Sequence, residues 1–237
     1  MIQRLSVFWL HHMYPRLASL IATIGIVGLA TCLLILFLLS KLFEEVLERE
    51  AFTFDTSWLL WLHKHANPSL DAVMLTVTQL GNPNFVVTIV VITLAILWWQ
   101  RFRQEAKVFA IACLGALILN TGLKLFFSKV RPQLWPSLIS ETSFSFPSGH
   151  ALGSLVLYGF LAYLLATHYP KFSKIIWILA ITLIAAIGLS RLYLGVHWPT
   201  DIIAGYEVGF LWLMMCITML KLQKLRRLNI FNSCNSR

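Results

Sequence analysis

The sequence is poor in charged residues. Of its 237 residues only 12% are Asp, Glu, Lys or Arg, whereas soluble domains carry about 25%. Hydrophobic residues make up 58% of the chain and are gathered into long blocks. Such a composition excludes an ordinary soluble globular domain and is typical of an integral membrane protein.

Cysteine is also scarce, and its spacing matches no motif. The chain has four cysteines, Cys32, Cys113, Cys216 and Cys234, of which three lie inside apolar blocks. This pattern excludes a disulfide framework and a cysteine metal site, and indicates small core residues. Internal repeats and low-complexity linkers are missing too, so a single domain over residues 1–237 is expected.

Six apolar blocks are long enough, or nearly long enough, to cross a bilayer, which takes about 20 residues. The first is too long and too apolar for the core of a cleavable signal peptide. The sequence therefore predicts an all-α, polytopic bundle of six transmembrane helices, over residues 17–39, 85–99, 108–123, 151–167, 175–190 and 202–220.

Acidic residues are fewer than basic ones, and the formal net charge is +9. Most Lys and Arg residues fall on one side of the six-span layout, the side that holds both termini. Because positive residues favour cytoplasmic loops, we predict an N-in, C-in orientation. The basic surplus is then a signal of topology, and no nucleic-acid partner is expected.

The segment between the first two spans, residues 53–80, has helical periodicity of its own. Trp58, Trp61 and Leu62 follow a spacing of i, i+3, i+4, and a second periodic stretch begins after Pro68. Two short amphipathic helices at the outer membrane interface are predicted. Such helices serve either as a structural cover on the bundle or as a side entrance for a lipid.

Three polar clusters lie at the ends of the predicted spans, all on the outer side. They are KLFFSKVRP at residues 124–132, PSGH at 147–150 and SRLYLGVHWPTD at 190–201. Each has a simple explanation by itself: a cation near a span end usually anchors the helix, as we expect for Lys129, and Pro-Ser-Gly commonly starts a helix. Together they indicate a functional site, because interfacial ionisable groups are costly.

The cations of these clusters suit a ligand with several anionic oxygens. Lys124, Arg131 and Arg191 supply positive donors, and arginine matches phosphate in bidentate geometry. Ser148 and Gly149 open a helix whose free N–H groups and dipole favour an anion. The sequence thus predicts a phosphate-binding site.

Two histidines and a carboxylate complete the set. Asp201, four residues after His197, could orient that ring and leave its other nitrogen free to attack phosphorus, while His150 acts as general acid. Two histidines and an aspartate could instead bind zinc, but the surrounding cations would repel it. We therefore expect neither a metal nor another cofactor.

The three clusters resemble the signature motifs of the type 2 phosphatidic acid phosphatase superfamily: Lys, six residues, Arg-Pro; then Pro-Ser-Gly-His; then Ser-Arg, five residues, His, three residues, Asp. Every one of these positions is occupied. The resemblance implies that His197 is the nucleophile, Asp201 its orienting partner and His150 the acid. It also implies that Lys124, Arg131, Ser148, Gly149 and Arg191 bind phosphate.

A lipid phosphate phosphatase at the outer face of a bacterial plasma membrane is accordingly expected. Candidate substrates are phosphatidic acid, phosphatidylglycerophosphate and an isoprenoid pyrophosphate. A phosphotransferase using the same site, a membrane transporter and a non-catalytic lipid-phosphate binder are the alternatives. Glu207, inside the last span, is expected to pack between helices or to support the site. No oligomeric state is predicted.

Overall fold

The structure is a computed structural model that describes residues 14–48 and 53–235, with side chains described over 25–48 and 53–225. In these parts of the chain the regular secondary structure is entirely helical, as predicted. The elements in chain order are α2 (Tyr14–Leu47), α3 (Thr53–His63), α4 (Pro68–Gln79), α5 (Pro83–Trp99), α6 (Arg103–Phe127), α7 (Gly149–His168), the 3-10 turn η2 (Pro170–Phe172), α8 (Ser173–Tyr193) and α9 (Pro199–Asn235).

Local sequence signals determine where several helices begin. Asn67 caps α4 by accepting a hydrogen bond from the Leu70 N–H, and Pro68 occupies the first turn. Asn82 and Pro83 start α5 in the same way. The Ser148 hydroxyl accepts from the Ala151 N–H at the start of α7. Proline is favoured at such positions because the first N–H groups of a helix have no partner within it.

The buried core lies around α7, which packs against α6, α8 and α9. Phe109 of α6 and Phe160 of α7 are fully buried, with their ring centroids 5.5 Å apart. At Gly205 of α9 an added Cβ would lie 2.8 Å from the Ser148 carbonyl oxygen. Small residues therefore bring the starts of α7 and α9 into close contact, as helix pairs in membranes often require.

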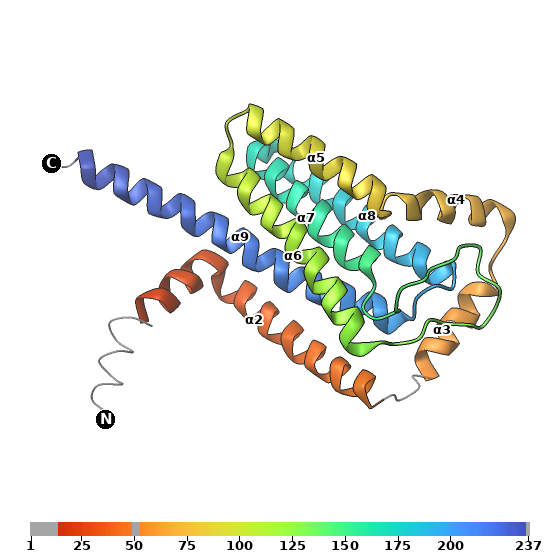
Figure 1. Cartoon of the computed structure of the whole chain (residues 1–237). Coiled ribbons are helices and arrows are strands. Elements are labelled where there is room, and N and C mark those ends of the chain that lie inside the picture. The colour runs from red at the N-terminus through yellow and green to blue at the C-terminus, as the bar shows by residue number, and fades with distance from the viewer. Residues whose placement is uncertain (1–13, 49–52, 236–237) are drawn as a thin grey trace, which may run out of the picture.

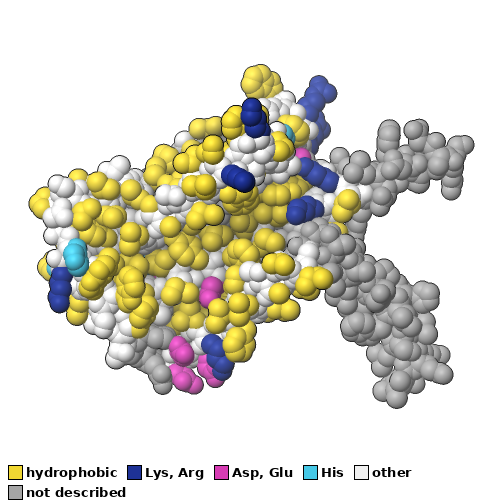
Figure 2. All heavy atoms as spheres, turned by 180° about the vertical axis from the view of Figure 1, so that it is seen from behind, with side chains coloured by type: hydrophobic (Ala, Val, Ile, Leu, Met, Phe, Trp, Pro, Cys, Tyr) yellow, Lys and Arg dark blue, Asp and Glu magenta, His cyan; other side chains and the backbone are white. Residues whose placement is uncertain are grey.

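Within the part of the chain that the structure describes, five helices are long and apolar enough to cross a membrane: 25–47 within α2, then α6, α7, the η2–α8 unit and 199–225 of α9. The expected span at residues 85–99 corresponds to α5, which has 17 residues. It is long enough to cross a membrane only when it is taken together with α4, and the two helices are joined at a bend of 43°. On the face that Figure 2 shows, hydrophobic side chains cover a broad area, and Lys, Arg, Asp and Glu side chains form smaller groups, mostly near the edges of this face. The chain is thus an integral membrane helix bundle with five or six candidate spans.

The two short helices expected between the first spans are present as α3 and α4. The first expected span is longer than predicted, because α2 continues through Lys41 and Glu44, whose side chains form an ion pair at 2.8 Å. At Gly25 the chain has φ +80°, so α2 is kinked there. Residues 17–24 of the first expected span precede this kink, and their side chains lie outside the described residues.

One end of the bundle gathers all three motifs. There α6 and α8 end, α7 and α9 begin, and the connection between α6 and α7 passes across the end beside α3 (Figure 1). The C-terminal part of α9 lies at the other end. This antiparallel arrangement places residues that are far apart in sequence at a common depth.

Candidate active site

His197 and Asp201 form the centre of the site. His197 lies between α8 and α9, and Asp201 is in the first turn of α9; both are essentially inaccessible to solvent. The Nδ1 atom of His197 is 3.3 Å from Asp201 Oδ2. The NH1 group of Arg131 donates to His197 Nε2 at 3.2 Å. Since Nε2 accepts a hydrogen bond, the proton of the neutral ring is on Nδ1, directed at Asp201.

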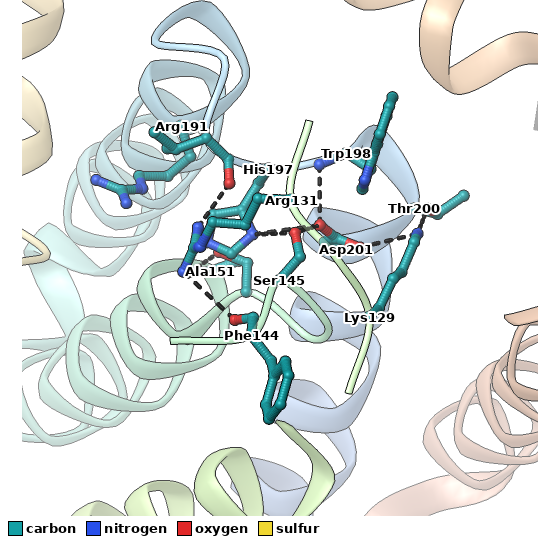
Figure 3. Close-up of polar contacts among 12 residues, drawn as sticks. Lys129, Arg131, Phe144, Ser145, Ala151, Arg191, His197, Trp198, Thr200 and Asp201 are labelled. Atoms are coloured by element: carbon teal, nitrogen blue, oxygen red, sulfur yellow. Dashed lines mark hydrogen bonds and ion pairs between the residues drawn. The ribbon is translucent and has the colours of Figure 1, made fainter. Parts of the chain in front are cut away.

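The Asp201 carboxylate is held from several directions (Figure 3). Oδ2 also accepts from the Trp198 N–H at 2.9 Å and from the Ser145 hydroxyl, and Oδ1 accepts from Lys129 Nζ at 3.0 Å. A buried carboxylate is costly unless it is paired and hydrogen-bonded. These hydrogen bonds and the ion pair offset the desolvation of the Asp201 carboxylate and fix its orientation.

Arg131 is held by the main chain around it. Its NH1 group donates to the Val196 carbonyl at 2.6 Å, and its Nε donates to the Ser143 carbonyl at 2.8 Å. Burial lowers the pKa of Arg131, although Glu141 and Asp201 act in the opposite direction. A guanidinium remains charged despite such a shift. The positive charge is therefore kept beside His197 Nε2.

Arg191, at the end of α8, is 1% exposed. Its NH1 group donates to Thr78 Oγ1 of α4 at 2.9 Å, and NH2 pairs with Glu141. Glu141 also lies 3.7 Å from Arg131 NH2, so one carboxylate bridges two arginines. Burial raises the pKa of Glu141, but the charge and hydrogen bond of Arg191 and the charge of Arg131 outweigh it, and the pKa is lowered.

The Nε–H of Arg191 is different from its other donors, because it is buried and has no hydrogen-bond partner among the described residues. A buried donor without a partner is unfavourable by about 1–3 kcal/mol. An anionic oxygen would satisfy it. The arginine is thus held by α4 and Glu141 while one donor is left for a ligand.

Lys124 lies in the last turn of α6 and points into the α6–α7 connection. Its Nζ donates to the Phe144 carbonyl and, at 3.3 Å, to the Ser143 hydroxyl. Arg131 contacts the same Ser143 and Phe144 groups. Lys124 and Arg131 therefore converge on one stretch of main chain, although α6 ends at Phe127 and Arg131 lies in the connection that follows it.

The PSGH segment is joined directly to the histidine–aspartate pair. The Ser148 N–H donates to the Asp201 carbonyl at 3.0 Å. Gly149 faces Asn120 of α6, and an added Cβ there would lie 2.9 Å from the amide nitrogen. His150 interacts electrostatically with His197, Arg191, Arg131 and Lys124. The ring also packs on the α4–α5 bend, since a Cβ at Gly81 would lie 2.7 Å from His150 Cδ2.

Burial dominates the ionisation of His197. It lowers the pKa of the imidazole to about 4, against the hydrogen bond and charge of Asp201, which raise it. Arg131 and Arg191 lower it further. The ring is consequently neutral near pH 7, as a nucleophile must be.

All eight site residues expected from the motifs lie at this end of the bundle: Lys124, Arg131, Ser148, Gly149, His150, Arg191, His197 and Asp201. The expectation that Lys129 is a membrane anchor was wrong, because its ammonium contacts Asp201 and Thr200. Other partners were missed because no motif marks them: Asp55, Thr78, Glu141 and Ser145. Glu207 lies on α9, and its Oε2 has no partner among the described residues.

No group of three or more His, Cys, Asp or Glu side chains with the geometry of a metal site occurs among the described residues. The cations Lys124, Arg131 and Arg191 instead supply the positive charge at this end of the bundle. The arrangement can bind an anion with several oxygens next to a neutral imidazole.

Known proteins with related sequences are membrane phosphatases. Residues 105–224 match the model of the PAP2 superfamily. Phosphatidylglycerophosphatase B of Bacillus subtilis (strain 168) is 36% identical over 147 residues, which are 61% of this chain and 72% of the relative. Undecaprenyl-diphosphatase of Sulfolobus acidocaldarius is 29% identical over 183 residues, 75% of this chain and 84% of the relative.

A solved structure agrees with the sequence comparison. The crystal structure of a transmembrane PAP2-type phosphatidylglycerolphosphate phosphatase from Bacillus subtilis superposes with a TM-score of 0.73 and 28% identity, over 79% of this chain and 94% of that one. The fold and the site together define an integral membrane phosphatase. The chain belongs to the PAP2 superfamily and is a membrane lipid phosphatase of that family.

Proposed function

We propose that this protein, acting as one membrane-embedded unit over residues 1–237, hydrolyses a phosphomonoester or pyrophosphate of a membrane lipid through a phosphohistidine at His197. The observation that carries this proposal is the hydrogen-bonded chain from Asp201 through His197 to Arg131. It fixes the tautomer in which Nε2 has a lone pair, and it places a phosphate-binding guanidinium beside that lone pair. Lipid phosphate held by Arg131 would lie next to the nucleophile.

In the first step the Nε2 lone pair attacks phosphorus and the phosphorus–oxygen bond to the lipid breaks. The imidazole gains positive charge, and Asp201 stabilises it through the Nδ1 proton. His150 gives a proton to the leaving oxygen. In the second step His150 accepts a proton from water, the water oxygen attacks phosphorus, the phosphorus–nitrogen bond breaks and inorganic phosphate leaves.

The phosphoryl oxygens would be bound by Lys124, Arg131 and Arg191, together with the Ser148 hydroxyl and the Gly149 N–H. The free Nε–H of Arg191 and the N-terminus of α7 support this assignment. Fixed positive donors can stabilise charge that develops on a transferring phosphoryl group. The proposed reaction therefore proceeds without a metal ion.

The relatives suggest the class of substrate. Their names specify phosphatidylglycerophosphate and undecaprenyl diphosphate, and a further relative is a lipid A 4'-phosphatase. We propose a lipid of this kind, with phosphatidic acid as a further candidate. A phosphotransferase would share the first step and differ only in the acceptor. Release of inorganic phosphate from a single purified lipid, with no second lipid present, distinguishes hydrolysis from transfer.

We further propose that the site faces the extracytoplasmic side of a bacterial plasma membrane, with six spans and both termini in the cytoplasm. The support is the excess of Lys and Arg on the side opposite the site. Single cysteines at Lys64 and Lys171, in a background with the native cysteines replaced by serine, test it. A membrane-impermeant maleimide should label Lys64→Cys in intact spheroplasts, and Lys171→Cys only after permeabilisation. The reverse pattern would exclude this orientation.

The nucleophile is tested by His197→Ala, with His168→Ala at the far end of α7 as the control. His197→Ala should abolish phosphate release and the acid-labile phosphoenzyme formed with labelled lipid, while the protein remains monodisperse in detergent. His168→Ala should retain both signals, because its ring contacts the Leu164 carbonyl and Phe102, away from the site. Activity that survives in His197→Ala would exclude this mechanism.

A further inference from the structure

Lys129 contacts the Asp201 carboxylate of the His197–Asp201 pair. The Nζ atom donates to Asp201 Oδ1 at 3.0 Å and to Thr200 Oγ1 at 2.9 Å. It approaches Asp201 from the side opposite His197, which contacts the other carboxylate oxygen (Figure 3). Its side chain is 19% exposed, so the ion pair is largely shielded from water.

A second carboxylate, Asp55 of α3, shares this ammonium. Asp55 is 3% exposed and lies 3.8 Å from Lys129 Nζ. It accepts from the Thr200 N–H at 3.0 Å and from the Thr200 hydroxyl at 2.6 Å. Two buried carboxylates are therefore balanced by one lysine, and Thr200 hydrogen-bonds to both Lys129 and Asp55.

From this geometry we propose that Lys129 and Asp55 are positioning residues that set the orientation and charge of Asp201, and through it the readiness of His197 to accept a phosphoryl group. This inference rests on the proposed function of His197. Their side chains contact Asp201, Thr200 and each other. Both residues act through Asp201 and not on the phosphate. Because Asp55 belongs to α3, this helix contributes to the proposed mechanism.

The direction of the effect follows from the charges. Without the ammonium, two buried carboxylates would face each other, and the pair would bind a proton more tightly at His197 or at Asp201. Either event removes the form in which a neutral His197 ring directs its Nδ1 proton at an ionised Asp201 and keeps a lone pair on Nε2. Burial raises the pKa of Asp55, while Thr200 and Lys129 lower it, so the lysine limits proton uptake by this cluster.

Other charged and titratable groups also face His197: Arg131, Arg191, His150, Glu141 and Asp201. The arginines disfavour protonation of the ring, and the carboxylates favour it. Substituting Lys129 changes the charge balance around Asp201 and His197 while every one of these groups remains in the protein. A shift in the pH profile of the variant can thus be assigned to the lysine.

The test compares Lys129→Met, Lys129→Arg, Asp55→Asn and the double variant Lys129→Met/Asp55→Asn in phosphate release from phosphatidylglycerophosphate micelles. Lys129→Met should lower kcat by about 10- to 100-fold, the range for losing a hydrogen bond to a charged group, with a much smaller change in KM. The acidic limb of its kcat/KM profile should move to higher pH. Asp55→Asn should move that limb to lower pH, and Lys129→Arg should restore most of kcat.

The double variant separates charge balance from packing. Removing the carboxylate and ammonium together should recover part of the kcat lost in Lys129→Met, whereas a purely structural role predicts a greater loss in the double variant. Wild-type kcat and pH profile in Lys129→Met, or a loss confined to KM, would overturn the inference. Should Lys129→Met fail to fold, an unshifted acidic limb in Asp55→Asn would overturn it as well.

His197→Ala, measured in parallel, keeps the two proposals apart. An inactive His197→Ala together with a fully active Lys129→Met rejects only the positioning role. An active His197→Ala rejects the nucleophile and, with it, the basis for the positioning role.

Discussion

The hydrogen bond between Thr78 and Arg191 predicts that α4, which carries none of the family motifs, contributes to phosphate binding. Thr78→Val keeps the shape of the side chain and removes the acceptor for Arg191 NH1, whose donor hydrogen would remain buried. A hydrogen bond to a charged group contributes about 1.5–3 kcal/mol. At 1.36 kcal/mol per tenfold, kcat/KM should fall about 10- to 150-fold if the whole loss appears in the transition state.

The assay is phosphate release from phosphatidylglycerophosphate in detergent micelles, with kcat/KM taken from initial rates. Thr76→Val is the matched control, because that hydroxyl lies on the same helix, is exposed and donates only to the Ala72 carbonyl among its described contacts. Thr78→Ser retains the hydroxyl and should recover most of the activity. The reasoning is refuted if Thr78→Val and Thr76→Val are equally active.

Three further outcomes are expected. Gly81→Ala should lower kcat without unfolding the protein, because its Cβ would lie 2.7 Å from His150 Cδ2, whereas Gly153→Ala, where nothing lies within 4 Å, should be neutral; equal rates would contradict the contact. The pKa of His197 is lowered from 6.5 to about 4, so protonation favours the unfolded chain. Stability is fully present above pH 6.5 and should decline toward about pH 4, less steeply in His197→Gln when thermal unfolding is followed; parallel slopes would refute this origin. Incubation with a chelator of divalent metals should leave phosphate release unchanged, and its complete loss would revive a metal-dependent mechanism.

Much of the fold follows from periodicity and composition. The apolar blocks predicted the long helices, and the periodic stretch that begins after Pro68 predicted the start of α4 to within one residue. The features that periodicity and composition did not predict depend on tertiary packing between residues far apart in the sequence. The continuation of α2 past Lys41 goes with the burial of Val46 in the core, and α5 is related to α4 by a bend of 43°.

The site was predicted where spacing carries the chemistry. His197 and Asp201 lie four residues apart across the start of α9, and Lys124 and Arg131 lie seven residues apart across the end of α6, so a short stretch of sequence contains each pair. Lys129 was misassigned because a lysine near a span end looks the same whether it contacts headgroups or a buried carboxylate. Asp55 and Thr78 could not be found from their neighbours, since their partners lie 145 and 113 positions away in the chain.

The main-chain hydrogen bond from the Ser148 N–H to the Asp201 carbonyl has a consequence for how variants of this protein behave. It joins the start of α7 to the start of α9 through main-chain atoms alone. Replacing the side chain of His150 or His197 should therefore leave the segments that carry these residues aligned. Inactive variants at those positions should therefore preserve an undistorted binding pocket. They are suited to trapping an intact lipid for structure determination.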